Sequence, residues 1–127
     1  MIKVGLVGCG RISKKHSNIL GDNLVEGITL KAVCDINFNK AQNIAKKYNV
    51  IPYSSMHEMM IKEEIDLIAV LTESGNHAKN VIELSKYGKD IIVEKPMALN
   101  NKDAELMIEA CNNNKIKLFV IKQNRYN

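Results

Sequence analysis

The first residues able to carry chemistry form a glycine-rich segment, Gly8-Cys9-Gly10-Arg11-Ile12-Ser13, directly after a short apolar run. Gly8 permits a tight turn, and Gly10 lets the backbone approach a pyrophosphate. A helix that follows would point its N-terminal amides at that anion. Ser13 stands where a third Gly or Ala is usual and is still small enough for close packing. The spacing favours a dinucleotide phosphate site, with five candidate cofactor-binding residues: Gly8, Cys9, Gly10, Arg11 and Ile12. For Arg11, a solvated surface position is an equally good interpretation.

An acidic residue follows the second apolar run at the distance such a site requires. Asp35 comes 22 residues after Ser13. Its carboxylate can accept hydrogen bonds from the adenosine ribose hydroxyls and would repel a 2′-phosphate. We therefore expect NAD as the cofactor, with NADP disfavoured by about tenfold or more. Lys40 would partly offset that repulsion, and the alternative for Asp35 is a simple turn residue after a strand.

The remaining reactive side chains are expected to be structural. The three cysteines, Cys9, Cys34 and Cys111, show no CxxC spacing, and their odd number argues against a closed disulfide framework. They fit core or tight-turn positions in a reducing, cytoplasmic setting. His16 is expected beneath the first helix and His57 at the surface, and we expect no metal site.

Size and composition limit the possible functions. The 127 residues suffice for one domain but are short for a complete dehydrogenase. A net charge of +4, with basic and acidic residues interspersed, predicts neither a nucleic-acid partner nor a membrane partner. The longest apolar run, around residues 65–71, is interrupted by Asp66 and is too short for a membrane span. The N-terminal run enters the glycine segment without a cleavage-site pattern, so no signal peptide is expected.

Short β-branched runs that would position these residues alternate with helix-period segments. The runs are nearly continuously apolar, which is typical of parallel strands covered on both faces. The expected strands are Lys3–Val7, Thr29–Cys34, Ile51–Tyr53, Leu67–Leu71, Asp90–Val93 and Ile116–Ile121.

The segments between these strands have the marks of amphipathic helices. Asn37 and Ser55 are expected N-caps, and Gly88 is an expected C-terminal cap. Apolar stripes at helical spacing are formed by Ala41, Ile44, Ala45 and Tyr48, by Ala78, Val81, Ile82 and Ser85, and by Ala104, Met107, Ile108 and Cys111.

Six strands alternating with five helices predict an α/β fold, namely a doubly wound, mostly parallel sheet with strand order 3-2-1-4-5-6. We expect residues 1–127 to form this single dinucleotide-binding domain. Its first and fourth strands would place their carboxyl ends side by side, where ligands bind in this architecture.

Two later segments add to the pattern, namely residues 71–77, Leu-Thr-Glu-Ser-Gly-Asn-His, and the tripeptide Glu94-Lys95-Pro96. With the glycine segment, they resemble the Gfo/Idh/MocA family of NAD(P)-dependent oxidoreductases, which have a Rossmann domain of this kind. The tripeptide is the most characteristic of that family. Thr72 to His77 looks like its T-P-N-x-x-H segment, with Glu73-Ser74 in place of Pro-Asn. Residues 122–125, Lys-Gln-Asn-Arg, resemble the segment found at this position in one branch of the family. That branch acts on nucleotide-linked sugars for surface polysaccharides such as lipopolysaccharide.

The resemblance implies an NAD-dependent dehydrogenase of a sugar or nucleotide-sugar. Lys95 would be the catalytic residue beside the nicotinamide, and Glu94 would contact the nicotinamide ribose. Leu71, Thr72, Glu73 and His77 would line the middle of the cofactor. The resemblance also implies a C-terminal substrate domain that these residues lack, and a homo-oligomer for the full-length protein. We expect the present chain to bind NAD with little or no turnover.

Two other functions stay open. A stand-alone dinucleotide-binding or redox-sensing module would perform no catalysis and would have a polar surface where a second domain otherwise docks. A different Rossmann enzyme, such as a methyltransferase, could use the glycine segment and Asp35 but would leave Glu94-Lys95-Pro96 without a role. That tripeptide could also be only a strand-ending salt bridge and turn.

Overall fold

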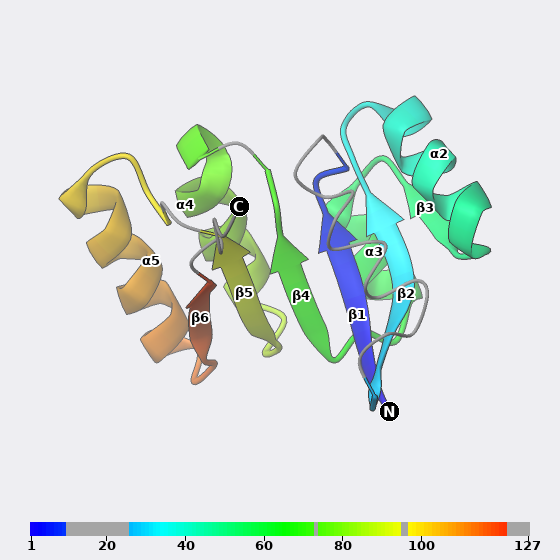
Figure 1. The fold of residues 1–127 in the computed structure, drawn as a ribbon. Coiled ribbons are helices and arrows are strands. Elements are labelled where there is room, and N and C mark those ends of the chain that lie inside the picture. Colours follow the sequence, from blue (N-terminus) through cyan, green and yellow to red (C-terminus); the bar gives the residue numbers. More distant parts are fainter. Residues whose placement is uncertain (10–25, 73, 95–96, 122–127) are drawn as a thin grey trace, which may run out of the picture.

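A computed structural model describes residues 1–9, 26–72, 74–94 and 97–121. Its six strands are all parallel and form one sheet in the order β3-β2-β1-β4-β5-β6 (Figure 1). The predicted strand order is confirmed, and every predicted strand boundary lies within two residues of the observed one. The strands are β1 (Ile2–Val7), β2 (Ile28–Cys34), β3 (Ile51–Tyr53), β4 (Leu67–Val70), β5 (Asp90–Glu94) and β6 (Leu118–Ile121).

Local capping chemistry sets where the described helices begin. The side chain of Asn37 accepts a hydrogen bond from the Asn39 N–H at 3.1 Å, and that of Ser55 accepts from the Glu58 N–H at 3.3 Å. Both predicted N-caps are therefore confirmed. Gly88, the predicted C-terminal cap, lies three residues after Ser85, the last residue of its helix, and has a φ of +72°. The helices are α2 (Phe38–Tyr48), α3 (Met56–Lys62), α4 (Ser74–Ser85) and α5 (Asn101–Asn113). The helix predicted after the glycine segment lies outside the described residues.

The helices divide between the two faces of the sheet (Figure 1). On one face, Ala41 and Ile44 of α2 pack with Leu6 of β1. On the other face, α3, α4 and α5 bury side chains such as Met59, Leu84 and Met107 against the sheet. Because the chain changes face between β3 and β4, the strand order reverses at β1 and β4. The predicted crevice at the carboxyl ends of these two strands is therefore the ligand position of this architecture.

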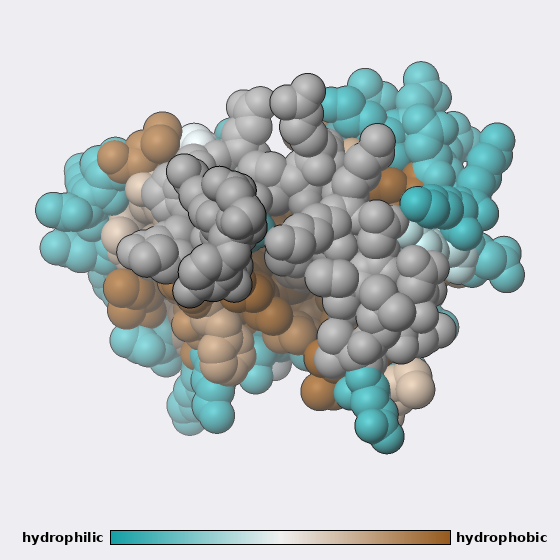
Figure 2. Space-filling view, in the orientation of Figure 1, coloured by the Kyte–Doolittle hydropathy of each residue, from teal (hydrophilic) through white to brown (hydrophobic). Residues whose placement is uncertain are grey.

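One part of the sheet lacks a described helix on the α2 face. The register pairs Ile92 with Phe119 and Glu94 with Ile121, so these side chains share that face. Phe119 is 47% exposed and Ile121 is 37% exposed. Hydrophobic surface is visible over β5 and β6 in Figure 2, beside residues drawn in grey. We name Ile92, Phe119 and Ile121 the β5–β6 apolar strip.

The described helices are also informative about membranes. Among them, none has both the length and the apolar character required to cross a bilayer.

Candidate functional site

The carboxyl end of β1 turns at Gly8 in a conformation that requires glycine. Its φ is +101°, and a Cβ there would lie 2.8 Å from both the carbonyl carbon of Leu71 and the nitrogen of Thr72. The Gly8 N–H donates to the Cys34 carbonyl at 2.8 Å. The turn is therefore wedged between the ends of β2 and β4, where a side chain would collide with backbone. This is the tight turn that the sequence predicts at Gly8, and Gly10, predicted to approach the pyrophosphate, lies outside the described residues.

Asp35 lies at the end of β2 and ties two segments together through its carboxylate. One oxygen, Oδ2, accepts from the Cys9 N–H at 2.8 Å, and the other, Oδ1, accepts from the Asn37 N–H at 2.8 Å. An ionised carboxylate offers about four acceptor positions, so each oxygen keeps acceptor capacity for a ligand hydroxyl. The carboxylate thus fixes the glycine turn against the start of α2 and can still receive a ribose.

These residues border a cavity of about 550 Å³, a volume typical of small-molecule sites. One side is formed by the ends of β1 and β2, and other sides by the start of α3 and by one face of α4. The lining residues are Val7, Gly8, Cys34, Asp35, Ile36, Lys40, Ser54, Ser55, Met56, His57, Leu71, Thr72, Asn76, Lys79, Asn80 and Glu83. Four of the predicted cofactor-binding residues, Gly8, Asp35, Leu71 and Thr72, line this one cavity.

His77 is placed behind the cavity wall, where it holds the loop after β4. Its Nε2 lies 2.6 Å from the Thr72 carbonyl oxygen, and because a carbonyl only accepts, this nitrogen carries the hydrogen. The Thr72 hydroxyl donates to Asn80 Oδ1 at 2.8 Å. His77 is 3% exposed. Its described contact therefore orients Thr72, which itself faces the cavity.

Cys9 and Glu94 lie outside the cavity lining. The Cys9 thiol donates to the Cys34 carbonyl at 3.4 Å, and burial together with the Asp35 charge raises its pKa to about 12. Burial and Asp35 also raise the pKa of Cys34 to about 12. Neither thiol is therefore a nucleophile near neutral pH.

Glu94 is 6% exposed and follows Val93, which pairs with Val70 of β4. The predicted site residues Gly10, Arg11, Ile12, Glu73 and Lys95 lie outside the described residues.

Comparison with known proteins decides the family. Residues 2–122 match the sequence model of an oxidoreductase family with an NAD-binding Rossmann fold. The chain belongs to the Gfo/Idh/MocA family. It is an NAD-binding Rossmann domain of this group of dehydrogenases, as the sequence motifs predicted.

Several members of the Gfo/Idh/MocA family are similar along most of this chain. An uncharacterized oxidoreductase of Streptococcus pneumoniae is 31% identical over 91% of this chain and 30% of its own length. Inositol 2-dehydrogenase of Salmonella typhimurium is 30% identical over 86% of this chain and 33% of its own length. The crystal structure of the WlbA dehydrogenase from Bordetella pertussis, in complex with NADH and UDP-GlcNAcA, superposes with a TM-score of 0.90. WlbA is 36% identical, and the match covers 99% of this chain and 38% of WlbA. The chain thus spans about a third of each relative.

Two parts of the cavity wall were not predicted from the sequence: one face of α4, and His57. Asn76, Lys79, Asn80 and Glu83 recur at helical spacing along α4 and all face the cavity. The spacing of these polar residues, opposite the apolar stripe of the same helix, was a signal in the sequence that could have predicted this wall.

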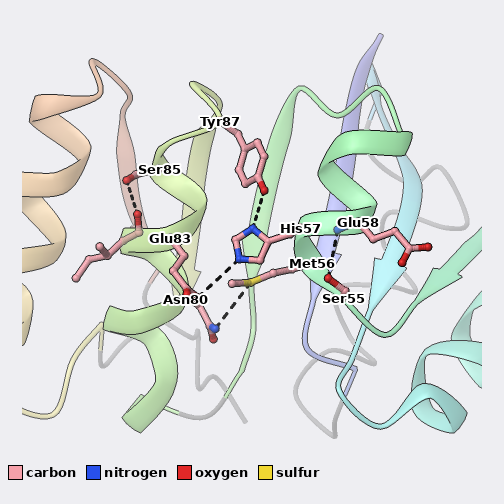
Figure 3. A network of polar contacts seen from close by, with 9 residues as sticks. Ser55, Met56, His57, Glu58, Asn80, Glu83, Ser85 and Tyr87 are labelled. Atoms are coloured by element: carbon pink, nitrogen blue, oxygen red, sulfur yellow. Dashed lines mark hydrogen bonds and ion pairs between the residues drawn. The ribbon is translucent and has the colours of Figure 1, made fainter.

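His57 is the second contributor: its side chain is 45% exposed, as expected for a surface residue, and it also faces the cavity. It lines the cavity from the start of α3, and its Nδ1 lies 2.6 Å from the Tyr87 hydroxyl (Figure 3). Because only two residues lie between the end of β3 and the start of α3, the first turn of α3 lies at the ligand edge of the sheet. This contact joins residues 30 positions apart, so no local pattern predicts it.

Proposed function

We propose that this domain binds NAD for a dehydrogenase that moves a hydride between nicotinamide and a secondary alcohol or ketone carbon of a sugar or nucleotide-sugar. The observation that carries this proposal is the similarity, at 36% identity and a TM-score of 0.90, to WlbA, whose structure holds NADH and UDP-GlcNAcA. The similarity to inositol 2-dehydrogenase supports a polyhydroxylated substrate. The branch that makes surface polysaccharides, including lipopolysaccharide, is part of the proposal, as is a cytoplasmic location.

The described residues fit NAD. The Gly8 turn packs against the backbone of Leu71 and Thr72 and borders the cavity. Asp35 would accept hydrogen bonds from the adenosine ribose hydroxyls with the acceptor capacity that Cys9 and Asn37 leave unused. Leu71 and Thr72 would line the middle of the cofactor. Since the described amides of Gly8 and Cys9 already donate within the protein, the pyrophosphate would be held by the following residues of the segment, Gly10 to Ile12.

The catalytic chemistry is proposed for the carboxyl end of β5. Glu94 ends that strand beside the end of β4, and Lys95 follows it directly. When bound, NAD would supply the acceptor for the hydride. Lys95 would polarise the substrate oxygen and hold or release its proton, and Glu94 would contact the nicotinamide ribose. His77 would act indirectly, by orienting Thr72.

A second, substrate-binding domain and a homo-oligomeric assembly complete the proposal. The β5–β6 apolar strip supports the second domain because its side chains share a face that no described helix covers. The alternative of a stand-alone redox-sensing module predicts a polar surface there, and the strip is apolar. The strip therefore favours the dehydrogenase over the module.

Paired calorimetric titrations with NADH and NADPH test the cofactor site. We expect saturable binding of both, with NADH tighter by about tenfold because Asp35 repels a 2′-phosphate. Tighter NADPH binding would mean that Lys40 outweighs Asp35. Absence of NADH binding would contradict the site. Separately, robust oxidation of a UDP-sugar by these 127 residues would contradict the need for a second domain.

A further inference from the structure

The cavity has a polar wall that the cofactor contacts above do not use. His57, at the start of α3, and Glu83, on α4, both line it together with Asp35. His57 Nε2 lies 4.0 Å from Glu83 Oε2, and His57 Nδ1 lies 2.6 Å from the Tyr87 hydroxyl (Figure 3). The side chains of His57 and Glu83 are 45% and 39% exposed, so solvent and ligands reach them.

The neighbours of His57 assign its hydrogen. A carboxylate only accepts, so the neighbouring Glu83 favours the tautomer with the hydrogen on Nε2. Nδ1 then accepts from the Tyr87 hydroxyl, which fixes the ring. The 4.0 Å separation of Nε2 and Oε2 is too long for a direct hydrogen bond. A donor and an acceptor thus stand side by side on the cavity wall, both available to a third group.

We propose that this pair recognises the adenine base of NAD, with Glu83 accepting from the 6-amino group and His57 Nε2–H donating to ring nitrogen N1. The inference rests on the NAD site proposed above. With the adenosine ribose at Asp35, the base would occupy the part of the cavity bordered by α3 and α4. Adenine presents a donor beside an acceptor on this edge, which is the complement of the protein pair.

Hypoxanthine reverses that pattern, because it has an oxygen at position 6 and a hydrogen on N1. A site built to pair with a donor at position 6 leaves its own groups unpaired against hypoxanthine. Reduced nicotinamide hypoxanthine dinucleotide is therefore the matched probe, since it keeps the ribose, pyrophosphate and nicotinamide of NADH. The ratio of the two dissociation constants isolates the base contact.

The experiment measures both dissociation constants by calorimetry for the unaltered chain and three variants. We expect NADH to bind about fivefold more tightly than the hypoxanthine analogue, less than a buried charge-assisted hydrogen bond would give, because the pair is partly open to water. Glu83→Gln should bring the ratio close to one, since the glutamine amide can also donate to a 6-oxygen. Tyr87→Phe should lower the ratio by about twofold, because the His57 ring loses the hydroxyl that orients it. Glu109→Gln, the same change at an exposed position on α5, should leave the ratio unchanged.

The outcomes separate this inference from the cofactor site itself. Equal affinity of the unaltered chain for the two dinucleotides, with NADH still bound, would overturn the adenine contact alone. So would an unchanged ratio in Glu83→Gln. If that variant does not fold, as judged by circular dichroism, an unchanged ratio in Tyr87→Phe overturns the contact instead. Loss of NADH binding by the unaltered chain would contradict the proposed NAD site.

Discussion

The centre of the sheet and its β6 edge differ in how completely they are covered. In β1 and β4, side chains on both faces are buried, among them Val4, Leu6, Ile68 and Val70. In β6, Phe119, Val120 and Ile121 are between 37% and 47% exposed. The central strands and β6 both have the continuously apolar sequence that is typical of strands buried on two faces. Among the described residues, however, only the central strands are covered on both faces. The sequence of a strand therefore indicates that its faces are suited to burial, but it does not indicate which element buries them.

That difference coincides with the position of the candidate site. The Gly8 turn and Asp35 lie at the carboxyl ends of the covered strands β1 and β2, where packing on both faces fixes the backbone. The β5–β6 apolar strip is suited to docking, since each Å² of apolar surface removed from water contributes about 25 cal/mol. The centre thus holds the candidate site on a backbone packed on both faces, whereas at the edge the described residues leave apolar side chains partly exposed. The following predictions test this division.

The largest effect is expected at Gly8. Gly8→Ala should lower the free energy of unfolding by about 3–5 kcal/mol and abolish measurable NADH binding, because strain at positive φ adds to a collision with the Leu71 and Thr72 backbone. Urea unfolding and calorimetric titration measure both. Gly27→Ala is the matched control, since Gly27 also has positive φ (+85°) but no atom lies within 4 Å of its added Cβ. It should cost about 1 kcal/mol and leave binding intact. Equal effects of the two variants would contradict a tight turn at the covered centre.

A pair of substitutions on neighbouring strands compares the two faces directly. Ile91→Ala should cost about 2–4 kcal/mol of unfolding free energy, because Ile91 is fully buried between β5 and the helices of the other face. Phe119→Ala should cost under about 1 kcal/mol, because Phe119 already keeps 47% of its surface in water. Urea unfolding of both variants measures the difference. Similar losses would mean that the strip is covered within this chain, and the argument for a second domain would lose its support.

The fold was largely predictable because its signals are local. Apolar runs located all six strands, and the caps at Asn37 and Ser55 follow from side chains next to the backbone groups they satisfy. The predicted stripe on α5 was only partly right, since Met107 and Cys111 are buried but Ile108 is 48% exposed. Helix α5 covers the edge of the sheet, so a narrower stripe of its surface is buried there.

The site was predictable in its glycine turn and acidic residue, but not in its remaining wall. The Cys9 N–H to Asp35 bond spans 26 residues, and the approach of His57 to Tyr87 spans 30. Such contacts depend on which face each helix turns to the cavity and on how far each strand extends. Sequence spacing predicts which residues reach the carboxyl edge of the sheet, and only the packed helices determine which of them meet.

Among the predicted substitutions, the next largest effect is expected at Asp35. Asp35→Asn should weaken NADH binding by about tenfold and reduce the preference for NADH over NADPH, because an amide is a weaker acceptor and does not repel a 2′-phosphate. Asp66→Asn is the matched control, since Asp66 Oδ2 also accepts a backbone N–H from β1, that of Lys3 at 2.9 Å, but at the opposite end of the strand. It should leave both affinities unchanged. Titration of each variant with both dinucleotides checks this, and equal weakening by the two variants would assign Asp35 a purely structural role.

The smallest effect is expected in the reactivity of the three buried thiols, which report on both regions. Burial raises the pKa of Cys9 and Cys34 from 9.0 to about 12 and also raises the pKa of Cys111. At pH 8 only roughly one folded Cys9 in ten thousand is a thiolate, so alkylation requires local opening. Cys9 and Cys34 lie at the covered centre, and Cys111 lies on α5 near the edge. Cys111 should therefore be alkylated by iodoacetamide a few-fold faster, as measured by mass spectrometry of peptides.

Cofactor and pH should act differently on these thiols. NADH should slow the alkylation of Cys9 and Cys34 only, because ligand binding stabilises the closed state of the region it contacts. Since the pKa of these thiols is raised in the folded chain, the unfolded chain loses its thiol protons first as the pH rises above 9. The contribution of Cys9 and Cys34 to stability is thus complete below pH 9 and is lost progressively toward pH 12. All three rates should then rise faster with pH than thiolate formation alone explains. If NADH protected Cys111 as strongly as Cys9, the two regions would open together, and the division between centre and edge would fail.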